Sequence, residues 1–210
     1  MLQLQLESLQ ERLANDNATT LSKLDRSYRA MQRLNELVEA LLDVSRIATG
    51  RFALHLEPGD LADIVATAVD RMHEAAAAAG CALSVTTHCA VGSWDRSRID
   101  QVVTNLVSNA IRYAAGAPIA VRVLRDDHAA VIEVRDGGPG LPSGKLAQIF
   151  ERFERGASMR HYGGLGLGLY VVREITQAHG GEVTAENRLC GGACFTVRLP
   201  LRAASHELVA

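Results

Sequence analysis

The sequence has few aromatic residues and no excess of charge of either sign. Only 4% of its 210 residues are Phe, Trp or Tyr, and 22 basic residues stand against 24 acidic ones, giving a formal net charge of -2. Proteins that bind nucleic acids usually concentrate positive charge and offer aromatic rings on which bases stack. Because this sequence lacks both features, we expect no nucleic-acid partner.

Long apolar runs and paired metal-ligand cysteines are also missing. No stretch approaches the roughly 20 apolar residues that a membrane span needs, and the N-terminal MLQLQLESLQ has no signal-peptide core. We therefore expect a cytoplasmic location. The spacing of the four cysteines is not the two-plus-two spacing of a zinc site, which favours reduced core thiols over zinc. These cysteines are Cys81, Cys89, Cys190 and Cys194.

The first fifty residues are predicted to form a helical hairpin. Leucines recur at 4-3-4 spacing from Leu2 to Leu13, the polar NDNATT follows, and the apolar period resumes between Leu24 and Ser45. Two arms cannot bury their apolar stripes completely against each other. We expect a second copy of the chain to complete a four-helix bundle, and packing on the chain's own globular domain is the alternative.

Beyond residue 51 the pattern mixes strands and helices. Short β-rich runs (FALHLEP, ALSVTTH, IAVRVLR, AVIEVRD, GEVTAEN and CFTVRLPL) alternate with helical stretches near residues 60–79, 98–114 and 167–179. Neighbouring runs joined by short turns such as RDDH favour hairpins. We predict an α+β fold, a two-layer α/β sandwich with a mixed, largely antiparallel sheet, preceded by the helical hairpin.

An aspartate precedes a glycine-rich turn in RDGGPGLPSG. Strand alternation places Asp136 on the same face as Ile132 and Val134, so its carboxylate should point toward the interior. A buried charge needs partners, and Gly138 and Gly140 leave room for a flat ligand with a donor to approach the backbone. The alternative is a turn aspartate that caps its own backbone amides.

One face of the helix predicted in QVVTNLVSNAIRYAA carries two amides and a guanidinium. Asn105 and Asn109 lie four residues apart, and Arg112 follows three residues later. Hard cations accept neutral amide oxygens, and arginine binds phosphate oxygens directly. The face therefore predicts a magnesium and phosphate site, and solvated asparagines on an amphipathic helix are the alternative.

A second glycine cluster opens a helix in HYGGLGLGLYVVREITQAHGGE. Gly163, Gly164, Gly166 and Gly168 lead directly into amphipathic sequence. Bare backbone amides at a helix N-terminus favour anions, so phosphate can bind there. A glycine-rich loop is a weak signal by itself, and this one matches neither the dinucleotide fingerprint nor the glycine-lysine phosphate loop.

Four stretches, taken together, resemble the nucleotide-binding boxes of sensor histidine kinases. They are NLVSNA (105–110), DGGPG (136–140), IFERFER (149–155) and GGLGLGL (163–169). The run from 33 to 61 is similar to the family's second dimerisation helix and linker, and GGACFTVRLPL is similar to its last strand. The resemblance implies a truncated dimerisation hairpin over 1–50, an ATP-binding catalytic domain over 51–202 and a tail over 203–210.

The resemblance also implies roles for individual residues. Asp136 would accept a hydrogen bond from the adenine amino group, and Asn109, with Asn105, would hold Mg²⁺. Arg112 would reach the phosphates of ATP, and Tyr113 would line the nucleotide pocket. The other residues implied in ATP binding are Gly138, Gly140, Phe150, Gly164, Gly166, Leu167, Gly168 and Leu169.

In the same family, residues 141–162 would form a lid over ATP. Phe150 and Phe153 would dock this lid, and Arg155 or Arg160 would approach the γ-phosphate. Such a lid suits phosphoryl transfer, whose barrier falls mainly through positioning and charge neutralisation. The implied partners are a second copy of the chain and a response regulator, and membrane contact would come only through a sensor region absent from this chain.

Related ATPases offer a different reaction for the same fold. Type II topoisomerases, the ninety-kilodalton heat-shock chaperones and mismatch-repair proteins resemble one another in a glutamate that activates water one helical turn before the magnesium asparagine. Here that position is Asn105, and an amide cannot take a proton from water at neutral pH. Transfer to an external acceptor is therefore favoured over hydrolysis. A non-catalytic nucleotide-binding dimer that regulates a kinase or response regulator is a further alternative.

The phospho-acceptor is the main departure from the family. Its histidine belongs to a His-Glu/Asp-Leu-Arg-x-Pro motif on the first hairpin helix, and residues 1–14 lack it. Self-phosphorylation on the hairpin is therefore not expected. The run SHEL at 205–208 copies the start of this motif, which makes His206 an alternative acceptor, although a polar tail is the preferred interpretation.

Overall fold

The computed structural model describes residues 52–142, 144, 146, 148–152 and 166–201, together with residues 24, 26–28, 30, 31, 34, 37, 38, 41–45 and 47. The chain divides into two compact units, Met1–Thr49 and Gly50–Ala210. Every described residue of the first unit is helical. The first arm of the predicted hairpin, residues 1–14, lies outside the described residues.

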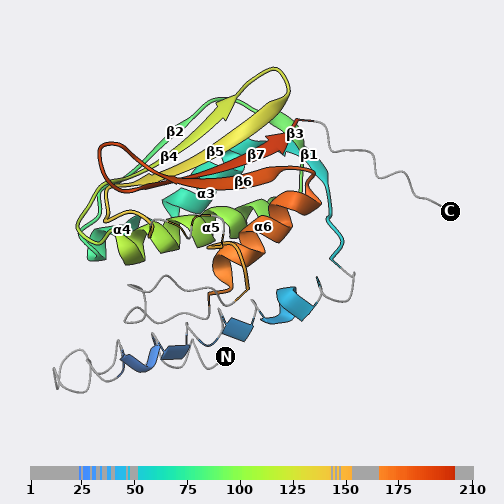
Figure 1. Ribbon diagram of the computed structural model, residues 1–210. Coiled ribbons are helices and arrows are strands. Elements are labelled where there is room, and N and C mark those ends of the chain that lie inside the picture. Colours follow the sequence, from blue (N-terminus) through green and yellow to red (C-terminus); the bar gives the residue numbers. More distant parts are fainter. Residues whose placement is uncertain are drawn as a thin grey trace. The chain divides into compact units, whose positions relative to one another are not determined.

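The described part of the second unit contains seven strands and four helices (Figure 1). In chain order they are β1 (Glu57–Asp60), α3 (Leu61–Asp70), α4 (His73–Ala78), β2 (Leu83–Thr87), β3 (Val91–Trp94), α5 (Arg96–Tyr113), β4 (Ile119–Arg125), β5 (Ala129–Asp136), α6 (Gly168–Ala178), β6 (Glu182–Asn187) and β7 (Ala193–Pro200).

Five of the strands form one sheet in the order β2-β4-β5-β7-β6. β2 pairs with β4 in parallel, and the other three pairings are antiparallel. β1 and β3 form a separate antiparallel pair. The predicted α+β fold with a mixed, largely antiparallel sheet is confirmed, as is the β4–β5 hairpin expected from the short RDDH turn.

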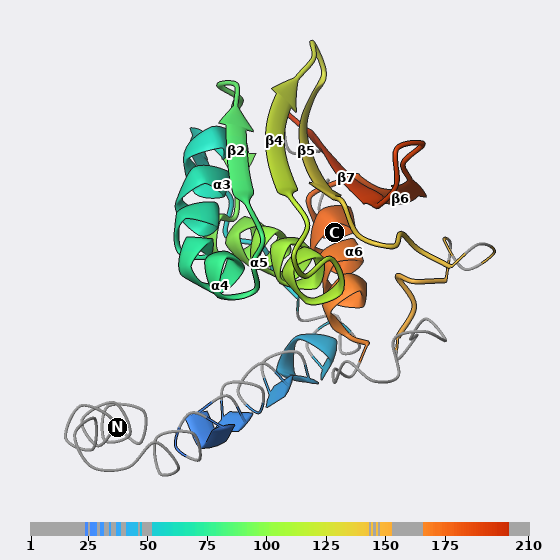
Figure 2. The same cartoon turned by 90° about the vertical axis from the view of Figure 1, so that its left-hand side faces the viewer.

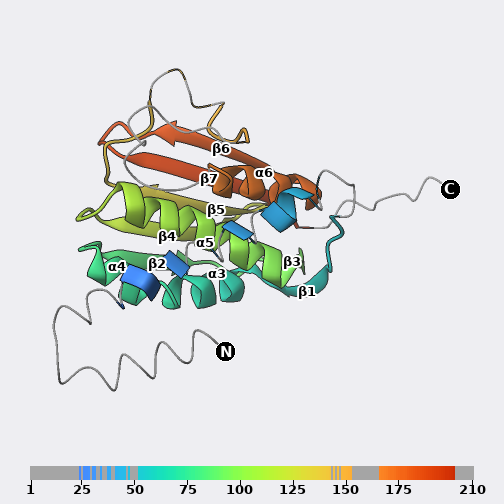
Figure 3. The ribbon, with the colours of Figure 1, turned by 90° about the horizontal axis from the view of Figure 1, so that it is seen from below.

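The helices cover one face of the five-stranded sheet (Figures 1 and 2). α5 runs between α3 and α6, as the view from the helical side shows (Figure 3). On β5, Ile132 and Val134 are fully buried, and α5 buries Val103 and Leu106 completely. Burying one such aliphatic side chain is worth about 1.5–3 kcal/mol relative to exposing it. The core between the sheet and α5 therefore fixes which side chains of α5 remain available for a site.

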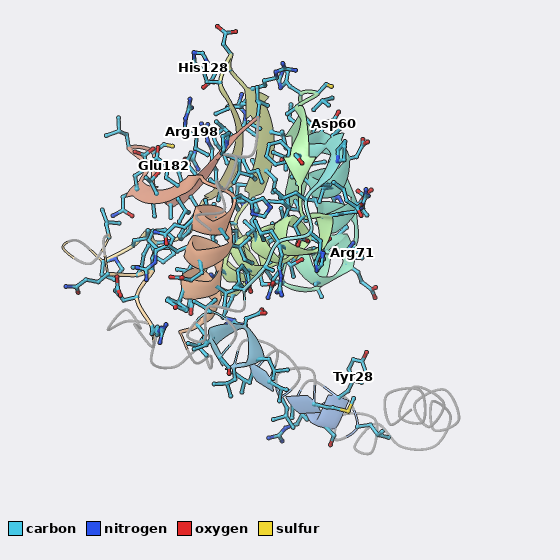
Figure 4. The ribbon with its side chains drawn as sticks, turned by 90° about the vertical axis from the view of Figure 1, so that its right-hand side faces the viewer. Tyr28, Asp60, Arg71, His128, Glu182 and Arg198 are labelled. Atoms are coloured by element: carbon cyan, nitrogen blue, oxygen red, sulfur yellow. The ribbon has the colours of Figure 1, made fainter. Side chains whose placement is uncertain are left out.

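The opposite face of the sheet is polar. Figure 4 shows Glu182 and Arg198 on the neighbouring strands β6 and β7, and His128 at the turn between β4 and β5. On β5, Arg135 Nη2 lies 2.8 Å from Glu133 Oε2. Alternation between a buried apolar face and this charged face is what a two-layer sandwich requires.

Three local predictions are wrong. Strand FALHLEP is a strand only from Glu57, and in the preceding segment the backbone amide of His55 donates to Asp95 Oδ2 instead of to a strand partner. The helix predicted over 60–79 is two helices, α3 and α4, separated at Arg71 and Met72. The strand β3, a short VGSW run containing glycine, was not predicted.

All four cysteines are free, and two of them correct the prediction. Cys81 and Cys194 are buried as expected for core thiols, but Cys89 and Cys190 are exposed. Within the described residues, no helix is both long and apolar enough to cross a membrane.

Candidate nucleotide-binding site

Asp136 ends β5 on its buried face, as strand alternation predicted, and is 7% exposed. Its Oδ1 accepts hydrogen bonds from the backbone amides of Gly138, at 2.9 Å, and Ala193, at 3.2 Å. Its Oδ2 makes no hydrogen bond with any residue that the structure describes. One oxygen therefore caps the turn, as the simpler interpretation expected, and the other remains for a ligand.

The glycines after Asp136 make room for other parts of the protein. A Cβ on Gly138 would lie 2.8 Å from Ala114 Cβ at the end of α5. Gly140 has a φ of +79°, and a Cβ there would lie 2.7 Å from Asn187 Oδ1. These positions must be bare for the turn to pack against α5 and β6, and access for an adenine ring stays a prediction.

The β6–β7 hairpin holds the same turn through side-chain contacts, and the sequence analysis did not predict these contacts. Arg188 Nη1 donates to the Asp136 carbonyl at 2.8 Å. Asn187 Oδ1 accepts from the Leu141 amide at 2.6 Å, and Asn187 Nδ2 donates to the Leu141 carbonyl at 2.8 Å. The adjacent glycines at 191 and 192 marked a turn in the sequence, but nothing local indicated which segment that turn would meet.

The predicted polar face of α5 is present, and its side chains have no partner among the described residues. Asn105, Asn109 and Arg112 are half-buried. Neither carboxamide makes a hydrogen bond, and Arg112 makes no ion pair, with any described residue. Two free amide oxygens one helical turn apart fit the donor preference of a hard cation such as Mg²⁺, and the guanidinium fits phosphate. Tyr113, also half-buried, is the last residue of the helix.

The N-terminus of α6 lies against this face. Gly166 has a φ of +69°, and Leu167 is the N-cap but supplies no side-chain hydrogen bond to the helix. The first turn of α6, which begins with Gly168 and Leu169, carries no acidic residue. A Cβ on Gly168 would lie 3.4 Å from Asn105 Oδ1. The free amides of a helix end, which favour anions, therefore lie beside the carboxamide face of α5.

The segment after the glycine-rich turn is anchored to the domain by aromatic contacts. Phe150 is buried and packs edge-on against Phe195 of β7, with ring centroids 6.5 Å apart. Arg152 Nη2 donates to the Tyr170 hydroxyl at 2.6 Å, and its guanidinium lies 4.7 Å from the centre of the same ring. Phe150 therefore packs on the core of the domain, and its role in docking a lid over ATP stays a prediction.

Several predicted site residues lie outside the described residues. They are Phe153, Arg155, Arg160, Gly164 and His206. Their roles stay predictions.

A buried histidine connects α6 to the start of α5. His179 Nδ1 lies 2.8 Å from the Ile175 carbonyl, and its Nε2 accepts from the backbone amide of Asp95 at 3.1 Å. Burial lowers the pKa of His179, against smaller opposing effects of the Ile175 carbonyl and the Asp95 charge. Burial would raise the pKa of Asp95, but hydrogen bonds from His55, Ser97 and Arg98 hold that pKa below its usual value.

Comparison with known proteins agrees with this geometry. The family model described as histidine kinase-, DNA gyrase B-, and HSP90-like ATPase matches residues 94–203. The chain is 41% identical over 171 residues to the signal transduction histidine-protein kinase AfsQ2 of Streptomyces coelicolor. It is 35% identical over 201 residues to the sensor protein KdpD of Escherichia coli. These alignments cover 80% and 95% of this chain, but only 31% and 22% of the two relatives.

A solved structure shares the fold. The mycobacterial sensor histidine kinase MprB has a TM-score of 0.62 and 26% sequence identity, over 71% of this chain and 100% of that one. The chain belongs to the family of histidine kinase-, DNA gyrase B- and HSP90-like ATPases, and it carries an ATP-binding catalytic domain of the histidine kinase type. The resemblance predicted from the four sequence boxes is confirmed.

Proposed function

We propose that this chain is the cytoplasmic catalytic part of a two-component sensor histidine kinase. It binds Mg-ATP and transfers the γ-phosphoryl group to a histidine, from which the group passes to an aspartate of a response regulator. The observation that carries the proposal is the meeting of three motifs along α5: the turn glycine Gly138 packs on Ala114 at its end, and Gly168 of α6 packs on Asn105.

In this proposal, the side chains divide the nucleotide between them. Asp136 Oδ2 accepts from the adenine amino group, while Oδ1 stays bound to the Gly138 and Ala193 amides and holds the carboxylate in orientation. The amides at the start of α6 and the Arg112 guanidinium bind phosphate oxygens. Asn109 and Asn105 hold Mg²⁺, which when bound neutralises charge on the phosphates.

Asn105 distinguishes transfer from hydrolysis. The related ATPases would place a glutamate there to activate water, whereas an amide cannot act as that base. The phosphoryl group must therefore go to another acceptor. Residues 1–54 contain no histidine, so the acceptor lies elsewhere, on another segment or chain, with His206 as the alternative within this sequence.

Dimerisation through the first unit belongs to the same proposal. Leu34, Val38 and Leu41, at helical spacing, are exposed in the single chain by 58%, 45% and 48%. An apolar helix stripe of this kind is normally buried, and a second copy of the chain offers the matching surface.

Incubation with γ-labelled ATP tests the proposal. The chain is incubated alone and with a separate helical hairpin that carries an acceptor histidine. We expect acid-labile label on the added hairpin. If the chain alone becomes labelled, His206→Gln should abolish that label. Release of free phosphate without transfer would support an ATPase, and tight ATP binding without either reaction would support a regulatory module.

A further inference from the structure

The turn at the base end of the proposed site is held at both ends by the β6–β7 hairpin. The register between β5 and β7 ends at Arg135 and Cys194, so Asp136 lies just beyond it. The Asp136 carbonyl instead accepts from Arg188 Nη1, and Asp136 Oδ1 accepts from the Ala193 amide. At the other end of the turn, both backbone groups of Leu141 bind the carboxamide of Asn187.

Packing at this contact leaves no space for adjustment. Gly192 has a φ of +82°, and a Cβ on it would lie 1.9 Å from the Asp136 carbonyl oxygen. No side chain fits there without displacing the end of β5. The hairpin backbone therefore abuts the residue whose free oxygen would meet the base.

From these contacts we propose that Arg188 is a positioning residue for base recognition, with Asn187 as its support at Leu141. Arg188 does not touch the nucleotide in this account. On one side, β4 pairs with Asp136 through Ile119. On the β7 side, where the strand register has ended, Arg188 holds the Asp136 carbonyl, so that Oδ2 is presented in one orientation before the ligand arrives. The proposal rests on the proposed function, since it assigns a selectivity role within that same site.

The physical reason is preorganisation. Hydrogen bonds require donor–acceptor distances of about 2.7–3.2 Å, so a carboxylate that moves freely satisfies the adenine amino group only part of the time. Holding the Asp136 carbonyl and Oδ1 removes the rotational freedom that binding would otherwise have to remove. Loosening this support should reduce the contribution of the amino group and leave phosphate binding nearly unchanged.

ATP and inosine triphosphate together measure this contribution. The two nucleotides share their ribose and phosphates, but inosine triphosphate has an oxygen where adenine has the amino group and cannot donate to Oδ2 there. Calorimetric affinities are compared for the wild-type chain, Arg188→Met and Arg188→Lys. Arg71→Met is the control, because Arg71 is the C-cap of α3 (Figure 4), a helix that carries none of the proposed site residues. Its guanidinium binds Asp100 in the first half of α5, more than one helical turn before Asn105.

We expect Arg188→Met to weaken ATP binding about tenfold and inosine triphosphate binding by less than about twofold. Arg188→Lys, which keeps a donor, should recover most of the loss, and Arg71→Met should change neither affinity. Equal losses for both nucleotides, or no loss, would overturn the inference. If the wild type itself binds no ATP, the proposed function fails instead. Should Arg188→Met not fold, Asn187→Ser, which weakens the hold on Leu141, carries the same expectation.

Discussion

At the residue scale, Asp136 uses its two carboxylate oxygens differently. Oδ1 is engaged by two backbone amides, and Oδ2 has no partner among the described residues. A substitution that keeps the shape and changes the chemistry therefore tests the residue's role in recognition.

Asp136→Asn should weaken ATP binding by about tenfold or more, because a neutral amide is a weaker acceptor than a carboxylate and can present a donor to the adenine amino group. Titration calorimetry measures the affinity, and thermal unfolding checks that the fold is kept. Asp127→Asn, in the exposed β4–β5 turn, is the matched control. Unchanged ATP affinity in Asp136→Asn would contradict the assignment.

The buried His179 predicts a pH dependence of stability. Its pKa is lowered in the folded chain from an ordinary value of 6.5, so between these two pKa values the unfolded chain binds more protons than the folded one. Stability is therefore fully present above pH 6.5 and decreases as the pH falls through that value toward the lower folded pKa.

Chemical unfolding between about pH 5 and pH 8, the range in which histidine titrates, measures this effect. His179→Gln should flatten the decrease on the acidic side, while His128→Gln, in the exposed β4–β5 turn, should leave it in place. An identical acidic decrease in His179→Gln and the wild type would show that another group causes it.

Residue-level prediction from the sequence succeeded where period and spacing carry the information. Alternation along β5 placed Asp136 on the buried face, and helical spacing placed Asn105 and Asn109 on one face of α5. Arg188 and Asn187 were missed because their importance comes from contact with a turn about fifty residues away in the chain. A local pattern encodes which face a side chain takes, but not which distant backbone it meets.

At the scale of elements, Phe150 anchors part of the segment that the sequence predicts as a lid, residues 141–162. The Phe150 ring packs against Phe195 of β7. Two residues after Phe150, Arg152 binds the hydroxyl of Tyr170 on α6. Two different elements therefore hold a stretch that has no regular secondary structure of its own.

Phe150→Ala should lower the free energy of unfolding by about 3 kcal/mol, the lower end of the range for removing a buried phenylalanine. Denaturant unfolding measures this loss. Phe150→Leu, which keeps most of the apolar volume, should lose much less. A loss below about 0.5 kcal/mol for Phe150→Ala would mean that the ring is not part of the core.

Element boundaries were predicted best for long periodic segments. α5 and α6 begin and end within about two residues of their predicted limits, which is the usual ambiguity of helix ends. The short strand β3 escaped because four residues with a glycine carry little periodicity. Segment 52–56 has strand-like composition, yet the tie between His55 and Asp95 gives it a different course.

At the scale of the whole molecule, the proposed dimer makes a separate prediction. The exposed side chains of Leu34, Val38 and Leu41 would be buried against a second copy. Placing a charge in such an interface without a partner is costly.

Val38→Glu should convert a dimer to a monomer at micromolar concentration, as measured by sedimentation. The matched control is Val91→Glu, since Val91 is 57% exposed on β3 and outside the hairpin. A wild-type chain that sediments as a monomer at high concentration would contradict the dimer without affecting the nucleotide site.

The central claim is that Asp136, Asn105, Asn109 and the start of α6 form one site for a single adenine nucleotide and its cation. Titration calorimetry of the wild-type chain with ATP, in the presence and absence of Mg²⁺, tests it most directly. We predict one saturable site per chain, with an ATP affinity that falls when Mg²⁺ is withdrawn. In Asn109→Ala, withdrawing Mg²⁺ should lower the ATP affinity by a smaller factor than in the wild type. The absence of binding heat, together with no ATP-induced rise in melting temperature, would contradict the claim.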